Sequence, residues 1–344
     1  MTDTARSAQI DAFLDASGWS GAERTTLADD ASFRRYERIA CADRRAVLMD
    51  APPVKEDVRP FRHVAGVLTS LGFSAPDILA ADEENGFLLL EDLGDDTYTR
   101  VLARDDTKEE ALYTLATDTL IDLHRRYQDG ADVPNYDKSV LVEREARLLT
   151  EWYWPAIHGT PCPAPVRAEF DGLWMNALSH AYSVPLSLVL RDYHVDNLIH
   201  LPDRQGTAQC GLLDFQDALI GPVTYDLVSL LEDARRDVPR PLAGKLIGRY
   251  LDAFPTLPPD ALLLSYAVLG VQRATKIIGI FTRLDRRDGK SQYLKHIDRT
   301  WRWLEGGLNH PMLFDLRTWY DSYFPRDMRR APPPAPGERA DERP

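Results

Sequence analysis

Two short stretches of this sequence hold the residue types that phosphoryl transfer needs. Leu190–Asn197 reads Leu-Arg-Asp-Tyr-His-Val-Asp-Asn, and Leu212–Gln216 reads Leu-Leu-Asp-Phe-Gln. In kinase chemistry one carboxylate orients the acceptor hydroxyl and accepts its proton, while an amide oxygen and a second carboxylate hold Mg²⁺ against the nucleotide phosphates. The spacing therefore predicts Asp192 as the catalytic base and Asn197 and Asp214 as metal ligands.

Each stretch follows a short apolar strand that would deliver its polar residues to a loop. The strands expected at 186–190 and 211–213 are separated by a distance that suits a β-hairpin. The alternative for Asp192 and Asn197 is a polar turn, because Asp and Asn are favoured turn residues. Asp214, as a third group at the correct spacing, favours the active site.

The rest of the pattern predicts an α+β chain of two lobes. In the smaller lobe we expect a helix at 7–17, a hairpin from 26–31 and 33–40, a strand at 46–49, a helix at 57–71 and a buried strand at 87–90. After that the pattern is mainly helical, with helices expected at 108–127, 141–154, 165–181 and over most of 225–324.

These elements suggest three regions of the chain. Residues 1–93 form a nucleotide-binding N-lobe, and residues 94–330 form a helical C-lobe with the catalytic loop and the substrate site. A hinge lies near residues 91–96. The tail at 331–344 is rich in proline and charge, so we expect it to be disordered.

Bulk composition excludes several classes of partner. The net charge of −13 argues against nucleic acid or an anionic membrane as the main partner. Three scattered cysteines and an N-terminus without an apolar segment favour the reducing cytoplasm. The longest apolar stretch, at 262–281, is interrupted by Gln272, Arg273 and Lys276 and is a poor membrane span. We expect a cytoplasmic monomer acting on small molecules.

The catalytic stretch resembles that of the aminoglycoside phosphotransferases and their relatives, whose pattern is His-Gly-Asp-x-His-x-x-Asn. Asp192, His194 and Asn197 match it, while Leu190 and Arg191 replace the first His and the Gly. The resemblance covers about residues 25–305. It implies a two-lobed, protein-kinase-like fold, with ATP and Mg²⁺ as cofactors. Asp226 is similar to the aspartate that braces the catalytic loop in this family, which implies a structural role.

Within this superfamily the chain is most similar to the anomeric sugar kinases that act on N-acetylmuramate and N-acetylglucosamine. The similarity lies in four segments, at 30–36, 48–53, 89–94 and 272–277. It implies transfer of the γ-phosphate of ATP to the C1 hydroxyl of the amino sugar, in cell-wall recycling. Aminoglycosides, choline and homoserine are the alternative acceptors.

The expected phosphate site departs from the kinase pattern. The loop over the phosphates has no glycine, although backbone N–H groups at Ser32 and Phe33 could contact phosphate oxygens. Met49 stands where kinases have a phosphate-binding lysine. Either a nearby cation substitutes, for which Arg34, Arg35 and Lys55 are candidates, or ATP affinity is low, or the chain is a nucleotide-binding pseudokinase. We favour substitution, because a pseudokinase would have little use for all three metal-site residues. Arg34 and Arg35 are candidates because strand alternation sends one of them into the cleft.

The remaining candidates contact adenine or the acceptor. Glu91 and Leu93 follow a buried strand and suit a hinge whose backbone binds adenine, although a core strand and a turn would read the same. His194 either contacts a substrate hydroxyl or braces its loop. Arg273 and Lys276 lie on an otherwise apolar helix, where they either pair with a core acid or bind an anionic substrate group such as a lactyl carboxylate.

Overall fold

The computed structural model describes residues 3–27, 33–128, 130 and 132–333, and its chain forms two compact units. The first unit comprises residues 1–131 and 195–218, and the second comprises 132–194 and 219–344. The chain therefore enters the first unit a second time between His194 and Val195, within the predicted catalytic loop. The two units do not coincide with the lobes predicted at 1–93 and 94–330, because the first unit extends to residue 131 and includes 195–218. The lobe boundary at residue 93 stays a prediction. Residues 334–344 of the expected disordered tail lie outside the described residues.

The first unit contains an antiparallel sheet in the strand order β1-β2-β3-β5-β4. Its strands are β1 (Glu23–Thr26), β2 (Arg35–Cys41), β3 (Arg44–Asp50), β4 (Ile78–Asp82) and β5 (Phe87–Glu91). The strands predicted at 33–40, 46–49 and 87–90 are confirmed. The strand placed at 26–31 is in fact β1 and ends at Thr26, while residues 28–32 lie outside the described residues.

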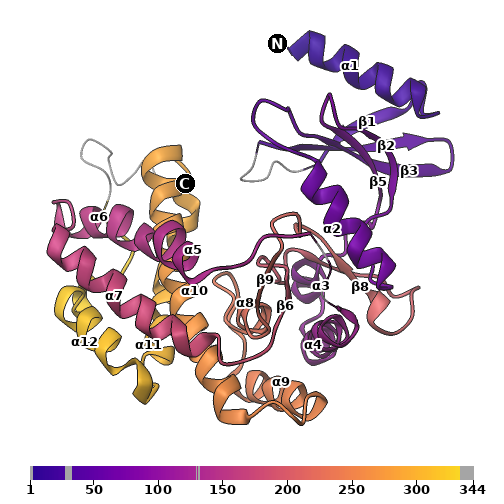
Figure 1. The fold of residues 1–344 in the computed structure, drawn as a ribbon. Coiled ribbons are helices and arrows are strands. Elements are labelled where there is room, and N and C mark those ends of the chain that lie inside the picture. The colour runs from indigo at the N-terminus through magenta and orange to yellow at the C-terminus, as the bar shows by residue number, and fades with distance from the viewer. Residues whose placement is uncertain (1–2, 28–32, 129, 131, 334–344) are drawn as a thin grey trace. The chain divides into compact units, whose positions relative to one another are not determined.

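Helix α1 (Asp3–Ala16) covers one face of this sheet (Figure 1). Its apolar side chains pack with alternate residues of the strands, and the rings of Phe13 and Phe87 stack with centroids 5.6 Å apart. Arg6 adds a buried ion pair, with Nε donating to Oδ1 of Asp50 over 2.9 Å. Because side chains alternate along a strand, the residues between those facing α1 point to the opposite face.

Three helices and a second hairpin complete the first unit. The helices are α2 (Arg59–Ser70), α3 (Tyr98–Arg104) and α4 (Glu109–Arg126). The hairpin joins β7 (Leu198–His200) to β8 (Cys210–Leu212). The strand expected at 211–213 therefore exists but pairs with β7, and the predicted pairing with strand 186–190 is wrong. That strand, β6 (Leu186–Val189), pairs instead with β9 (Leu219–Pro222) in the second unit.

The second unit is otherwise helical. Its helices are α5 (Lys138–Val140), α6 (Trp154–His158), α7 (Ala164–Ala181), α8 (Tyr225–Leu231), α9 (Arg240–Ala253), α10 (Pro259–Asp288), α11 (Ile297–Gly307) and α12 (Phe314–Tyr323). Figure 1 shows α10 running past α7 and α11, and its buried residues join theirs in one large core. Residues 141–146 and 149–153, predicted as part of one helix, wind as π-helical turns.

Gly279 permits a close approach between α10 and these π-helical turns. A β-carbon at this position would lie 2.4 Å from the carbonyl carbon of Leu148, a distance that atoms do not adopt. In the described part of the chain, α10 is the one helix that is long and apolar enough to cross a membrane, and 61% of its most apolar window is buried inside the protein. The central helix of a globular core meets the same criteria of length and composition.

Candidate active site

A pocket of about 350 Å³ in the first unit brings both predicted metal ligands together with the predicted hinge. Its apolar walls come from the sheet and from the β7–β8 hairpin, and include Val47, Leu90, Ile199 and Leu213. Its polar lining includes Glu91, Leu93 and Gly94 of the hinge segment and, at the other side, Asn197 and Asp214. An apolar slot with a few polar groups at its edges is typical of a site for a planar cofactor such as a nucleotide base.

The β7–β8 hairpin places Asn197 and Asp214 side by side. Asn197 directly precedes β7 and Asp214 follows β8, and the N–H of Leu213 donates to the carbonyl of Asn197 over 3.0 Å. The two side chains meet with Nδ2 of Asn197 donating to Oδ2 of Asp214 over 3.3 Å. Asp214 adopts a left-handed backbone with φ of 57°, and Gln216 donates to its Oδ1 over 2.8 Å. An amide oxygen and a carboxylate fit Mg²⁺, which takes one or two protein oxygens and completes its shell with phosphate and water.

The hinge is held by an arginine that the sequence did not single out. Arg38 on β2 donates through Nε to Asp92 over 2.7 Å and through Nη1 to Asp95 over 2.9 Å. The N–H of Gly94 also donates to Asp92, over 3.0 Å. Among the described residues the backbone N–H of Leu93 donates to no protein acceptor. A donor that is left open beside an apolar slot is what adenine recognition requires.

Arg34 is a cation that interacts electrostatically with Asp214. Its side chain is 12% exposed, and its Nε lies 3.8 Å from Oε2 of Glu56. Burial lowers the pKa of this guanidinium, but its electrostatic interactions with Tyr36, Asp214 and Glu56 outweigh burial and raise that pKa. Met49 lies on β3 opposite Tyr36 of β2 and is completely buried in the sheet.

The other residues proposed for the phosphate site lie differently. Arg35, the first residue of β2, is exposed. The N–H of Phe33 points at Oε1 of Glu56 over 3.3 Å, and the Phe33 ring lies 4.2 Å from the ammonium group of Lys55. Ser32 lies outside the described residues.

Asp192 lies in the second unit, half-buried and surrounded by cations. Burial alone would raise the pKa of its carboxyl group, but Lys276, His194 and Arg273 outweigh burial and hold that pKa below its usual value. Asp192 is therefore ionised at neutral pH, which is the state that a proton acceptor needs.

Asp226 holds the backbone just before Asp192. Its carboxylate accepts the N–H of Leu190 over 2.6 Å and the N–H of Arg191 over 2.9 Å. Arg191 has a left-handed φ of 71°, an unfavourable conformation for an arginine. Two hydrogen bonds to one buried carboxylate therefore fix the strained turn that presents Asp192, in keeping with the structural role that the resemblance implies for Asp226.

Lys276 is paired with a core acid, Glu145, which the sequence reasoning did not identify. Nζ of Lys276 lies 3.0 Å from Oε1 of Glu145, and Nη2 of Arg191 lies 2.9 Å from the same atom. The other oxygen of Glu145 accepts from the hydroxyl of Tyr136 over 2.7 Å and from Nε2 of Gln272 over 3.1 Å. The one signal for Glu145 in the sequence is its helical spacing with the apolar residues at 141–154.

Arg273 differs from Lys276 in its surroundings. It is 5% exposed, and among the described residues no carboxylate lies within 4 Å of its guanidinium and no hydrogen bond to it is formed. Its charge acts on Asp192, Asp226 and Glu232 from a greater distance. His194 is also buried, and its Nε2 lies 3.4 Å from Nη1 of Arg235. Burial and the Arg235 charge lower the pKa of His194, so its imidazole is neutral at pH 7.

The pattern of the phosphotransferase enzyme family matches residues 23–263 of this chain. The chain belongs to that family. It is 36% identical to the N-acetylmuramate/N-acetylglucosamine kinase of Caulobacter vibrioides over 94% of this chain and 98% of that protein. It is 40% identical to the kinase of the same name from Pseudomonas aeruginosa, over 92% of this chain and 96% of that one.

Solved structures confirm the fold. A choline kinase from Streptococcus pneumoniae superposes with a TM-score of 0.62 at 12% identity, covering 88% of this chain and 100% of that one. An aminoglycoside 2′-phosphotransferase in complex with GDP superposes with a TM-score of 0.59 at 12% identity, covering 87% and 98%. The protein-kinase-like α+β fold and the phosphotransferase family predicted from the sequence are thus confirmed, and the chain is a phosphotransferase with a hydroxyl acceptor.

Proposed function

We propose that this phosphotransferase transfers the γ-phosphate of ATP to the anomeric C1 hydroxyl of N-acetylmuramate or N-acetylglucosamine. The observation that carries the proposal is the carboxylate of Asp192, which surrounding cations keep ionised. One of these cations, Arg273, is buried and has no direct partner among the described residues. The names of the Caulobacter and Pseudomonas relatives support these two sugars as acceptors. We place the reaction in the cytoplasm, in the recycling of cell-wall sugars, and expect a monomer.

In this reaction Asp192 accepts the proton of the C1 hydroxyl. The freed oxygen forms a bond to the γ-phosphorus while the bond to the β–γ bridging oxygen breaks, and ADP leaves with that electron pair. A carboxylate suffices as the base, because an anomeric hydroxyl is more acidic than an ordinary alcohol. Asp226 keeps the strained turn at Arg191 in place and so orients Asp192.

Asn197 and Asp214 would hold Mg²⁺, which neutralises charge on the phosphates when it is bound. Glu91 and Leu93 would bind the adenine ring through their backbone, and the N–H of Leu93 has no acceptor within the described ranges of the chain. We assign to Arg34 the task of the lysine that Met49 replaces. The charge of Asp214 acts on Arg34, and Glu56 lies beside Arg34 as an acidic partner.

Arg273 is the best candidate to bind an anionic group of the sugar. Lys276 already shares Glu145 with Arg191, whereas Arg273 is buried near Asp192 without a direct carboxylate partner among the described residues. We assign to it the lactyl carboxylate of N-acetylmuramate. The cations around Asp192 (Lys276, Arg273 and Arg191) also disfavour polycationic aminoglycosides and choline, because like charges repel in a partly buried site.

The deciding experiment is parallel phosphate transfer from ATP to N-acetylmuramate, N-acetylglucosamine, kanamycin, choline and homoserine. We expect Mg²⁺-dependent ADP release with the two amino sugars and a phosphorus signal coupled to the anomeric proton by NMR. Phosphate on any other hydroxyl, or a preference for another acceptor, would reject the proposed substrate. A complete lack of transfer would favour a nucleotide-binding pseudokinase.

A further inference from the structure

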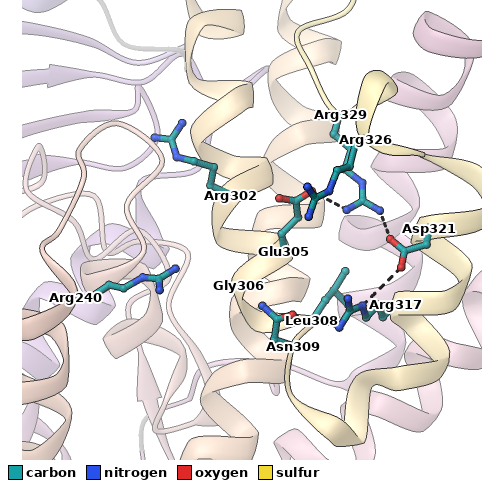
Figure 2. Close-up of a pocket in the computed structure, with 10 residues that line it drawn as sticks. All are labelled: Arg240, Arg302, Glu305, Gly306, Leu308, Asn309, Arg317, Asp321, Arg326 and Arg329. Atoms are coloured by element: carbon teal, nitrogen blue, oxygen red, sulfur yellow. Dashed lines mark hydrogen bonds and ion pairs between the residues drawn. The ribbon is translucent and has the colours of Figure 1, made fainter.

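A second pocket, of about 370 Å³, lies within the second unit, and half of its ten lining residues are arginines (Figure 2). Its charged lining consists of five arginines, Arg240, Arg302, Arg317, Arg326 and Arg329, and two acids, Glu305 and Asp321. The lining therefore carries three more positive than negative charges. This concentration is unusual on a chain whose net charge is −13. All five arginines belong to elements that the active-site residues do not use.

One arginine of this pocket is internally neutralised. Arg329 is 7% exposed at its side chain and pairs with both acids, with Nη1 lying 2.7 Å from Oε1 of Glu305. It also donates through Nε to the carbonyl of Phe324 over 2.7 Å. Arg317 approaches the already shared Asp321 at 3.6 Å. Figure 2 shows Arg329 and Arg317 on either side of Asp321. Both acids of the lining, Glu305 and Asp321, are therefore already paired with these arginines.

The other three arginines of the lining, Arg240, Arg302 and Arg326, have fewer acidic partners than positive charges. Arg302 lies 3.2 Å from Asp237, which also pairs with Arg299 at 2.9 Å. Among the described residues no carboxylate lies within 4 Å of the guanidinium groups of Arg240 or Arg326. Arg240 is moreover the first residue of α9, where the exposed N–H groups carry partial positive charge and a cation is unfavourable. Arg240 and Arg326 are both exposed, so an anion from solvent can reach their guanidinium groups.

We propose that this pocket binds a small phosphate compound with two adjacent phosphate groups, such as a diphosphate. A volume of about 370 Å³ is within the range of small-molecule pockets. The guanidinium fork donates two parallel hydrogen bonds to oxygens of one phosphate, and such charge-assisted bonds are stronger than neutral ones. The lining arginines come from separate elements, including α9, α11 and the turn at Arg326–Met328. A ligand with oxygens on several sides, such as tetrahedral phosphate, suits such a lining better than a planar carboxylate. This anion site does not depend on which sugar the active site accepts.

Isothermal titration calorimetry with inorganic pyrophosphate, in EDTA and without nucleotide, tests the site. We expect binding of one pyrophosphate that the double variant Arg240→Gln/Arg326→Gln weakens at least 10-fold. Neither substitution removes an ion pair seen within the described part of the chain, so the variant should melt like the wild type. Arg167→Gln, at an exposed arginine of α7 outside the pocket, is the matched control and should bind normally. Asp214→Asn should also bind normally, because it alters the first unit only.

Several results would overturn the proposal. Absence of binding would reject the site, and equal weakening by Arg167→Gln would reduce it to general attraction. Loss of binding in Asp214→Asn alone would assign pyrophosphate to the nucleotide site instead. Citrate serves as the carboxylate comparison, and citrate binding as tight as pyrophosphate binding would reject the preference for phosphate.

Discussion

The ammonium nitrogen of Lys276 lies 3.0 Å from Oε1 of Glu145, inside the core of the second unit. Burial works against the charge of Lys276, but Glu145 outweighs it and raises the pKa of the ammonium group. Glu145 thus keeps Lys276 cationic, and Lys276 in turn is the largest of the charges that keep Asp192 ionised. The pair stabilises the reactive state of the base without contacting the sugar.

The electrostatic effect of Lys276 on Asp192 predicts how catalysis depends on pH. Lys276→Met removes the largest favourable charge near Asp192, so the pKa of Asp192 rises towards the value that burial alone would impose. Because the base must be deprotonated, the acidic limb of the pH profile of kcat/KM should move to higher pH. Lys295→Met, at an exposed lysine of the same unit, is the control and should leave the limb in place. If the acidic limb of kcat/KM stayed in place in Lys276→Met, Lys276 would not be what keeps Asp192 ionised.

Asp226 predicts a pH dependence of stability. Burial raises the pKa of its carboxyl group from 3.8 to about 7, although the N–H groups of Leu190 and Arg191 lower it. A group whose pKa is higher in the folded state stabilises the fold below its unfolded pKa and loses that contribution as pH rises through its folded pKa. Between pH 4 and pH 7 the free energy of unfolding should therefore fall more in the wild type than in Asp226→Asn.

Urea unfolding of both proteins at a series of pH values measures this difference. Asp226→Asn should also lower kcat, since one of the two N–H groups at the strained turn loses its acceptor. Parallel stability curves for the two proteins would contradict the raised pKa. Burial also raises the pKa of Glu232 to about 7. Glu232 is present in both proteins, so its contribution to the pH dependence of stability cancels in the comparison.

The sequence predicted the chemistry of the site better than its supporting contacts. The apolar runs at 46–49 and 87–90 predicted β3 and β5, because side chains buried on both faces of a sheet read as continuous apolar stretches. β4 was missed, since Ile78–Asp82 contains two alanines and a polar end that favour no strand. The family spacing indicated Asp192, Asn197 and Asp214 without knowledge of their packing.

Long-range pairings were beyond the sequence. Strands of three or four residues carry little information on their partner, so the pairing of β6 with β9 and of β7 with β8 was mispredicted. The sequence left open a core acid for Lys276, but Glu145 is 131 positions away and only the packing of α10 on residues 141–146 brings them together. The π-helical winding of that segment has no signature in its apolar spacing.

Arg34 should prove necessary for ATP use. Arg34→Ala removes the cation that is coupled to Asp214, so we expect a higher KM for ATP and a kcat reduced by at least 10-fold. Arg35→Ala serves as the neighbouring comparison and should have a much smaller effect, because Arg35 is exposed. Steady-state kinetics with varied ATP at saturating sugar measures both. If neither substitution changed KM or kcat, substitution of the missing lysine by these arginines would be wrong.

Asp192→Asn should reduce kcat by several orders of magnitude with the fold intact, because an amide cannot accept the proton of the acceptor hydroxyl. Circular dichroism and the urea midpoint should stay close to those of the wild type. Asn197→Asp provides a contrasting variant, since it keeps an oxygen ligand for Mg²⁺ and should retain more activity at raised Mg²⁺. A near-normal rate in Asp192→Asn would remove this residue from the role of base.

Arg273 should determine the preference between the two sugars. If it binds the lactyl carboxylate, Arg273→Met should lower kcat/KM for N-acetylmuramate about 10-fold or more beyond its effect on N-acetylglucosamine, which lacks that group. Lys276→Met is the matched comparison on the same helix. Because Lys276 acts through Asp192, its loss should reduce kcat/KM for both sugars by a similar factor. The ratio of the two kcat/KM values in each variant is the measurement. An unchanged ratio in Arg273→Met, or a changed ratio in Lys276→Met alone, would transfer carboxylate recognition away from Arg273.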